Sequence, residues 1–108
     1  MDGAESIIDY YSNGKISSEY WYQNCRPHRK DKPAVIAYYP NGNINYERWY
    51  VNGLIHRDDG PAYISYYHTG EVYYQIWYQE GVVLSIEIFR LHCLVRGCKK
   101  GLESTFKR

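Results

Sequence analysis

The sequence is poor in the residues that fill a thick hydrophobic core, with 2 Phe and 1 Met among 108 residues. It also has no long apolar run, because the best candidate, residues 82–95, is interrupted by Ser85, Glu87 and Arg90. Such a stretch is too short and too polar to cross a bilayer. The acidic N-terminal segment, residues 1–11, lacks the apolar centre of a signal peptide, so no targeting segment is expected.

Cysteine and net charge also exclude several classes of protein. The 3 Cys cannot close a disulfide framework, which favours a reducing, cytoplasmic location. Cys93 and Cys98 lie near His92 but lack the second ligand pair of a zinc site, so neither a metal nor another cofactor is expected. The net charge of +1 does not select nucleic acid or membranes as partners. Without a phosphate loop or a nucleophile motif, we expect the protein not to be an enzyme.

What the chain has in excess is tyrosine, with 14 residues, together with 3 Trp. These side chains combine a broad apolar ring with a polar tip, so they suit a sheet whose faces are only half buried. A chain of this length has room for one modest core. The composition therefore predicts a single all-β domain of little depth.

A 28-residue repeat organises the chain. The positions that recur in register are Tyr10, Tyr38 and Tyr66, then Gly14, Gly42 and Gly70, then Trp21, Trp49 and Trp77. Self-similarity at a fixed period is typical of repeat architectures, in which neighbouring units bury each other's faces. One domain, 1–108, is thereby divided into repeats 10–37, 38–65 and 66–89, followed by a cap with a basic tail, 90–108.

Within a unit the residues predict a strand, a turn and a second strand. Residues 35–39 are β-branched and aromatic, Asn41-Gly42 favours a tight turn, and an extended run follows from Ile44 to Val51. Short connections pair successive strands as antiparallel neighbours, so we expect an antiparallel β-meander of tandem hairpins. The expected strands are 5–11, 16–22, 34–39, 44–51, 62–67 and 72–78. The residues expected to build this ribbon are Trp21, Trp49, Trp77, Gly42, Gly53 and Pro61.

Laid out in this way, the motifs resemble MORN-type repeats, especially the longer variant of YwqK-like proteins and of large-virus and phage proteins. The resemblance covers residues 10–81 and rests on YYxNG at 38–42, WYxNG at 49–53 and HRxDGPA at 56–62. It implies an antiparallel β-repeat ribbon that contacts other proteins or, in some families, acidic lipid headgroups.

The chain departs from this pattern in two places. Cys25 stands where the later units have Gly53 and Gly81, and the third unit has no HRxDGPA segment. Regular positions build the ribbon, so we expect specificity to lie where the repeat breaks.

The HRDD segment, residues 56–59, is the strongest catalytic candidate. A histidine oriented by an aspartate could act as a base, and Arg57 could bind phosphate. However, the segment recurs in part at residues 28–31, and catalytic residues seldom occur once per repeat. We therefore expect structural roles: His56 and Arg57 would bond backbone carbonyl groups of the loop, and Asp59 would close a turn.

One face of the sheet is the better candidate for binding. Alternation along residues 44–51 places Tyr46, Arg48 and Tyr50 opposite to Trp49, and exposed Tyr with Arg is typical of protein-binding hot spots. Burial of this face under the tail is the alternative. Stacking on nucleobases is disfavoured, because residues 1–89 hold seven basic and eleven acidic residues. The residues expected to bind a partner are Tyr46, Arg48, Tyr50, Tyr74 and Tyr78 on this face, Arg26, Arg29 and Lys30 in the first loop, and Arg96, Lys99 and Lys100 in the tail.

The C-terminal segment, residues 90–108, has six basic residues and one acidic residue. Ser85 is suited to cap a helix whose apolar residues Ile88, Leu91 and Val95 recur at helical spacing. We expect a short helical cap over 86–96 that covers the open edge of the last repeat, followed by a basic end.

The leading hypothesis is a non-catalytic protein-protein interaction module. It could be a small inhibitor, antitoxin-like or used in phage counter-defence, or a viral scaffold component in the host cytoplasm. The alternative is binding of acidic lipid or nucleic acid through residues 90–108. A homodimer through the exposed first and last strands is also expected.

Overall fold

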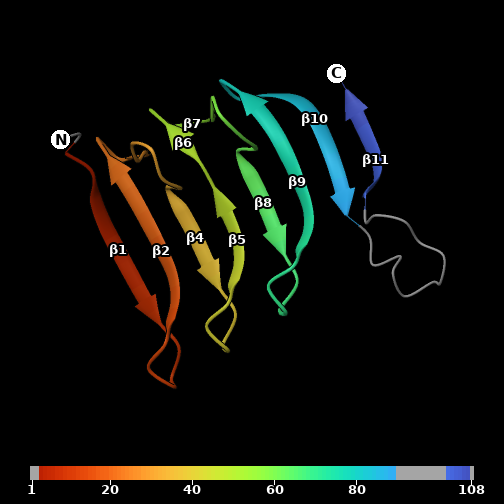
Figure 1. The fold of residues 1–108 in the computed structure, drawn as a ribbon. Helices are drawn as coiled ribbons and strands as arrows, with labels where there is room; N and C mark the ends of the chain where they lie inside the picture. Colours follow the sequence, from red (N-terminus) through yellow and green to blue (C-terminus); the bar gives the residue numbers. More distant parts are fainter. Residues whose placement is uncertain (1–2, 90–101, 108) are drawn as a thin grey trace.

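The computed structural model describes residues 3–89 and 102–107 of the chain. The strands in these residues are β1 (Glu5–Tyr10), β2 (Ile16–Gln23), β3 (Arg26–Pro27), β4 (Val35–Tyr38), β5 (Ile44–Arg48), β6 (Tyr50–Val51), β7 (Leu54–Ile55), β8 (Tyr63–Tyr66), β9 (Val72–Gln79), β10 (Val82–Phe89) and β11 (Leu102–Lys107). The main sheet has the order β1-β2-β4-β5-β8-β9-β10-β11, with β3 beside β2, while β6 and β7 pair separately (Figure 1). All these pairings are antiparallel, so the predicted all-β meander is confirmed.

The three long hairpins within the repeats close through the same turn. In the second unit, Gly42 has a φ of 97° and its N–H donates to the Tyr39 carbonyl oxygen at 2.9 Å. The Asn43 N–H donates to Asn41 Oδ1 at 2.8 Å. Glycine suits this turn because a Cβ makes a left-handed backbone costly. Each of these hairpins also shifts its register at the tyrosine that ends the first strand.

A tighter turn follows each Trp-Tyr pair. Asn52 and Gly53 join β6 to β7 with φ values of 49° and 87°. Two consecutive positive φ values give the two-residue hairpin turn that matches the twist of the strands. Asn24 and Cys25 adopt the same conformation in the first unit, with φ values of 54° and 62°. Cys25 therefore has a left-handed backbone that glycine adopts more readily.

The predicted strand 44–51 is divided at Trp49 into β5 and β6. The Trp49 N–H donates to the Ala62 carbonyl oxygen at 2.7 Å, and the Trp49 carbonyl oxygen accepts from the His56 N–H at 2.9 Å. Trp49 thus bonds to the residue just before β8 on one side and to its own short hairpin on the other. The chain leaves the main sheet at this residue.

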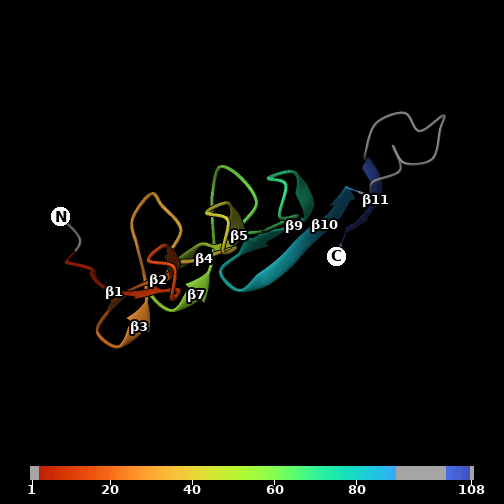
Figure 2. The same ribbon diagram turned by 90° about the horizontal axis from the view of Figure 1, so that it is seen from below.

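The units bury a small core between them. Ile36 lies opposite Glu19 and Glu47 in the neighbouring strands, and Ile64 lies opposite Glu47 and Gln75. The molecule measures only 17 Å along its shortest axis, and Figure 2 shows the strands in one layer. The hydrophobic residues buried in the described parts are Ala34, Ile36, Ala62 and Ile64. Both faces of the sheet therefore depend on half-buried aromatic side chains for their cover.

The predicted helix over 86–96 is wrong where the structure describes it. Val82–Phe89 form β10, which pairs with β9 on one side and with β11 on the other. The segment alternates polar and apolar residues around Ser85 and Glu87, which is the period of a strand, and both neighbouring strands supply backbone partners. The remainder of the predicted helix, residues 90–96, lies outside the described residues.

Candidate functional site

One face of the sheet carries a continuous aromatic cluster, which we call the tyrosine face: Tyr46, Arg48, Tyr63 and Tyr74. The ring of Tyr63 contacts Tyr46 and Tyr74 edge-to-face, with centroid distances of 6.0 and 5.6 Å. Tyr63 lies directly opposite Arg48 in the register of β5 and β8. All four side chains are half-buried, so they offer surface while holding one another in place.

A single cation lies in this cluster. The Arg48 guanidinium is 4.8 Å from the ring centre of Tyr46 and 5.2 Å from that of Tyr63. Burial lowers the pKa of Arg48, but the nearby hydroxyls of Tyr46, Tyr50 and Tyr63 outweigh it, so the pKa is raised. Burial and a hydrogen bond to Tyr63 also raise the pKa of Tyr74 to about 12. At neutral pH the tyrosine face therefore presents neutral phenols around one positive charge.

Further tyrosines extend the face toward its turns. Tyr73 is 43% exposed, stacks on Tyr67 with ring centres 4.8 Å apart, and meets Tyr74 edge-to-face at 5.0 Å. Of the other residues predicted to bind a partner here, Tyr50 is close enough to influence the pKa of Arg48. Tyr78 is half-buried in β9.

The opposite face holds a tryptophan cluster in each of the first two units. The Arg29 guanidinium lies 3.9 Å from the ring centre of Trp21, and that of Arg57 lies 3.7 Å from Trp49. Each arginine also donates to the backbone of its own loop, at the Pro33 and Pro61 carbonyl oxygens. Guanidinium stacked over indole is attracted by the ring's negative face.

A glutamate completes each of these clusters. Glu19 accepts from Trp21 Nε1 at 3.1 Å and from the Tyr38 hydroxyl at 2.6 Å. Glu47 accepts from the Tyr66 hydroxyl at 3.3 Å. Burial beside these carboxylates raises the pKa values of Tyr38 and Tyr66 to about 12. The tyrosine that begins one unit is thus bonded to the glutamate of the unit before it.

The three basic residues of the first loop that were predicted to contact a partner differ in how they lie in the fold. The Arg29 side chain is only 18% exposed and lies 3.9 Å from Glu19, so it is engaged within the fold. The Arg26 side chain covers Gly53 of the next unit, where an added Cβ would approach its Cδ to 3.2 Å. Lys30 is exposed. Three of the predicted contacts, Arg96, Lys99 and Lys100, lie outside the described residues.

The loop histidines connect one unit to the next. His28 Nδ1 accepts from the Asn52 N–H at 3.0 Å, and His56 Nδ1 accepts from the Glu80 N–H at 2.9 Å. The other ring nitrogen of His56 lies 2.9 Å from Asp58 Oδ1. The histidines thus bond backbone N–H groups of the following turn, rather than the carbonyl groups expected from the sequence. Asp59 lies 3.1 Å from Arg57 Nε, which fixes the arginine above Trp49.

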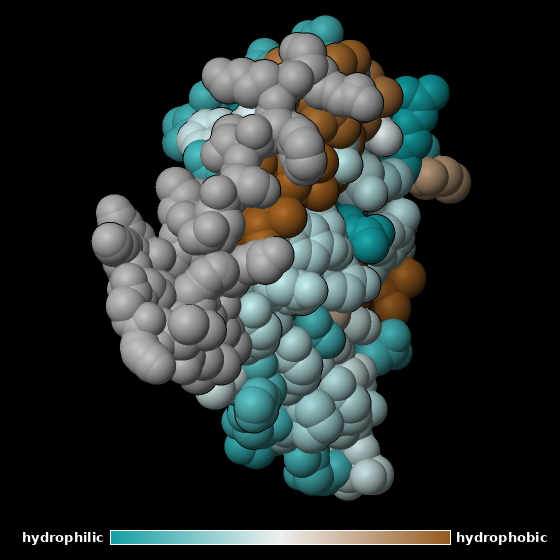
Figure 3. Space-filling model, turned by 90° about the vertical axis from the view of Figure 1, so that its right-hand side faces the viewer, coloured by the Kyte–Doolittle hydropathy of each residue, from teal (hydrophilic) through white to brown (hydrophobic). Residues whose placement is uncertain are grey.

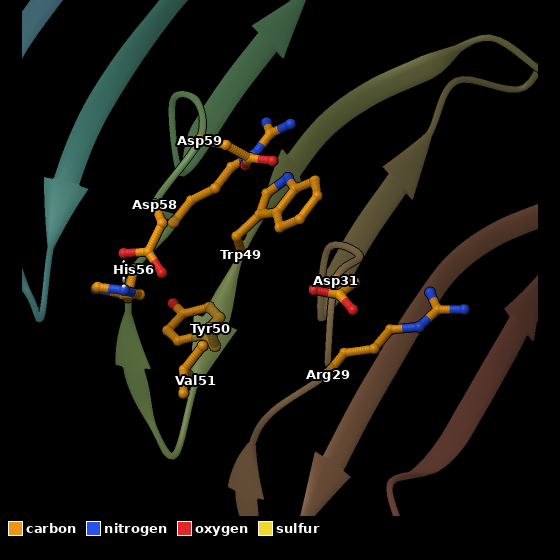
Figure 4. Close-up of a pocket in the computed structure, with 9 residues that line it drawn as sticks. Arg29, Asp31, Trp49, Tyr50, Val51, His56, Asp58 and Asp59 are labelled. Carbon is orange, nitrogen blue, oxygen red and sulfur yellow. Dashed lines mark hydrogen bonds and ion pairs between the residues drawn. The ribbon is translucent and has the colours of Figure 1, made fainter. Parts of the chain in front are cut away.

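A shallow pocket of about 180 Å³ lies between the first two loops. Figure 4 shows Trp49 between Asp31 of the first loop and the acidic side chains of the second. Trp49 Nε1 is buried and has no hydrogen-bond partner among the residues that the structure describes, in contrast to Trp21 Nε1. Two arginines and three aspartates line the pocket, and one of these charges is paired within it, because Arg57 Nε lies 3.1 Å from Asp59 Oδ1.

An apolar patch lies on the side of the molecule formed by β10, mainly in its upper part (Figure 3). Val82 is 61% exposed and Leu84 is 41% exposed. Leu54, which is 51% exposed, lies over Gly81, since a Cβ there would be 3.6 Å from Leu54 Cδ2.

Two further properties concern the described residues only. In residues 3–89 and 102–107, no three His, Cys, Asp or Glu side chains are grouped so that they could hold a metal ion. The same part of the chain has no helix long and apolar enough to span a membrane.

Sequence reasoning missed Tyr63, the centre of the tyrosine face. The signal was present, because hairpin pairing places Tyr63 and Ser65 on the same face as Tyr46 and Tyr74. In comparisons with known proteins, the chain matches no family model, no curated protein and no solved structure. The resemblance to MORN-type repeats therefore stays a prediction from the motifs.

Proposed function

We propose that the chain is a non-catalytic protein-interaction module that binds its partner through the tyrosine face. The observation that carries the proposal is the cluster of Tyr46, Tyr63 and Tyr74 around Arg48, on a sheet with no second layer in the described residues. Mutual ring contacts restrict these side chains before binding, which lowers the entropy lost when a partner orders them.

The chemistry of the face indicates the surface that it fits. One guanidinium among neutral phenols suits an apolar or aromatic protein surface that carries a single carboxylate near its centre. Such a surface could belong to a target that the chain inhibits, as in an antitoxin-like or phage counter-defence protein, or to a neighbour in a viral scaffold.

The loop contacts support a non-catalytic role. Both ring nitrogens of His56 are engaged, one by the Glu80 N–H and the other by Asp58. A general base needs a nitrogen free to take a proton from substrate. The side chain of Asp58 is 83% exposed, so it is also poorly shielded from solvent.

The test is affinity capture from cells of the source, followed by binding measurements with the purified partner. Arg48→Ala and Tyr63→Ala should each weaken binding by about 2 kcal/mol, or roughly thirtyfold in Kd, as central hot-spot residues do. Lys15→Ala is the matched control, because it removes an exposed cation from a turn away from the face.

Two results would contradict the proposal. The first is a partner whose affinity is unchanged by Arg48→Ala and Tyr63→Ala. The second is the absence of any captured protein together with salt-sensitive binding to anionic vesicles or nucleic acid. The latter would favour the basic segment, residues 90–108, as the binding element.

A further inference from the structure

The first strand of the sheet resembles an internal strand that lacks its neighbour. Ile8 of β1 occupies the position of Ile36 and Ile64 in the repeat, yet it is only half-buried, whereas they are 8% and 9% exposed. Tyr10 occupies the position of Tyr38 and is 63% exposed. In the described residues, β1 pairs with β2 alone and its other edge is open. Strand β1 therefore presents the edge that, in the later hairpins, the preceding hairpin covers.

The last two strands form a fourth hairpin in the register of the first three. In β4 and β5, Ile36 lies opposite Glu47 and the register shifts between Ala37 and Tyr38. In β10 and β11, Glu87 lies opposite Thr105 and the register shifts between Ile88 and Phe89. The bulge falls at the same place in both hairpins. β11 therefore holds the place that β2, β5 and β9 hold as the second strands of their hairpins.

This equivalence defines what the outer edge of β11 can accept. Inside the chain, the second strand of one hairpin pairs with the first strand of the next hairpin, as β2 pairs with β4 and β5 with β8. In a second copy of the chain, the first strand of the first hairpin is β1. β1 and β11 also run in opposite directions, because seven antiparallel steps separate them in the sheet.

We propose that the chain assembles head to tail, with β11 of one copy pairing with β1 of a second copy. The internal register, in which Glu19 lies opposite Ile36, places Thr105 opposite Ile8 of the second copy. Ser104 then lies opposite Asp9 of the second copy. The new junction repeats the geometry of the internal ones and continues the sheet from copy to copy.

Charge favours this pairing over the pairing of two identical edges. β1 carries Glu5 and Asp9, whereas residues 102–108 carry Lys107 and Arg108 against Glu103. Two copies of β1 side by side would bring four carboxylates onto one short strand pair, which is destabilising. Because the two joined surfaces differ, the contact is heterologous, and in a sheet that runs as one extended layer (Figure 2) it continues as an open chain. It uses the edges of the sheet and leaves the tyrosine face free.

The register can be tested by disulfide trapping between two differently tagged chains. In a background with Cys25, Cys93 and Cys98 changed to serine, one chain carries Asp9→Cys and the other Ser104→Cys. Directly opposed residues in an antiparallel pair lie about 4.5–5.5 Å apart at Cα, within the range of a disulfide. Mild oxidation should give the mixed disulfide. Ser12→Cys, in the exposed turn beyond β1, replaces Asp9→Cys in the control and should lose the product.

The untrapped protein gives an independent measurement. Its average molar mass, measured by sedimentation equilibrium, should rise steadily with concentration and exceed that of a dimer. It should fall in high salt, because salt screens the charges at the two ends. Arg48→Ala should leave both results unchanged, which separates this proposal from that for the tyrosine face. Disulfides only between two Asp9→Cys chains would overturn the proposal in favour of two-fold pairing. A monomer at every concentration, with no mixed disulfide, would overturn it outright.

Discussion

The junction between β5 and β8 and the junction between β9 and β10 achieve the same strand pairing with different chemistry. In the first, Glu47 lies opposite Ile64, and its carboxylate accepts from the Tyr66 hydroxyl. In the second, Gln75 lies opposite Glu87 and donates to its Oε1 at 2.7 Å. The carboxylate has moved to the other strand, and glutamine replaces the glutamate that would repel it.

Two of the three indole N–H groups bond the carboxylate of their junction, on whichever strand it lies. Trp77 Nε1 lies 3.5 Å from Glu87 Oε1, whereas Trp21 Nε1 donates to Glu19 on its own strand. Phe89 stands at the position of Tyr66, and Gln75 stands at the position of Glu47, the partner of the Tyr66 hydroxyl. The comparison teaches that a junction needs one carboxylate among its aromatic residues, and that either strand can supply it.

The largest expected effect comes from comparing a strand that has neighbours on both sides, β8, with the edge strand β1. Ile64→Ala should lower the free energy of unfolding by about 3 kcal/mol, because it leaves a cavity in a small core. Ile8→Ala, at the equivalent half-buried position, should cost less than about 1 kcal/mol in dilute solution. Urea unfolding measures both. Equal losses would show that β1 is as well covered as β8.

The role of the carboxylate at the junction of β9 and β10 can be tested by moving it from β10 back to β9. Gln75→Glu should destabilise the protein by roughly 2 kcal/mol, because two half-buried carboxylates would face each other without the amide donor. Adding Glu87→Ile restores the pattern of the internal junction and should recover most of that loss. A double-mutant cycle measures the coupling. Additive effects of the two substitutions would contradict the comparison.

The two loop histidines, each of which bonds the turn of the following unit, should have a smaller effect on stability. His56→Ala should lower stability by about 1–2 kcal/mol, since the Glu80 N–H loses its acceptor. His28→Ala removes the acceptor of the Asn52 N–H in the same way. Thermal unfolding of both variants should show similar losses. If His56→Ala left the stability unchanged, water would have replaced the histidine as the acceptor of the Glu80 N–H at no cost.

Alkaline pH should weaken the internal junctions selectively. Tyr38 and Tyr66 have pKa values of about 12 in the fold, against an ordinary value of 10.0. The unfolded chain therefore loses these protons first, so the stability they contribute is complete below about pH 10 and is lost as the pH rises toward 12. Tyr38→Phe combined with Tyr66→Phe should flatten this decline when stability is followed against pH. An unchanged slope in the double variant would contradict it.

The smallest expected effect lies in the tight turns. Cys25→Gly should stabilise the protein by about 0.5–1 kcal/mol, because it removes a side chain from a left-handed backbone. Gly53→Ala, at the equivalent position, should destabilise it by a similar or larger amount, since Arg26 also crowds the new Cβ. Differential scanning calorimetry resolves both shifts. Destabilisation by Cys25→Gly would show that the thiol makes a contact that outweighs the strain.

The repeat made much of the fold predictable. Tyrosine, glycine and tryptophan at fixed spacing located the hairpins, and the meander followed from the short turns between them. The break at Trp49 was not predictable, because it depends on hydrogen bonds to Ala62 and His56 that only the packed units supply. The strand β10 was missed because Ile88 satisfies both a helical and an alternating pattern, and a neighbouring strand decides between them.

The site was predictable in composition but not in its arrangement. Alternation correctly placed Tyr46 opposite to Trp49, yet it did not identify Tyr63, which reaches the cluster through the pairing of β8 with β5. Sequence reasoning also took Arg29 for a partner contact, although it stacks on Trp21. A cation beside an aromatic residue can face solvent or fold back onto the ring, and only the loop geometry separates these outcomes.

The order of strands in the sheet has a consequence for local opening. Each long strand pairs with the long strands nearest to it in the chain, so within residues 3–89 and 102–107 no pairing joins distant parts of the sheet. Opening can therefore begin at either end and stop at any junction, as in other arrays with nearest-neighbour contacts. Amide hydrogens of β4, β5 and β8 should exchange most slowly with solvent, and those of β1 most rapidly. The middle of the chain, rather than a central core, should then be its most protected region.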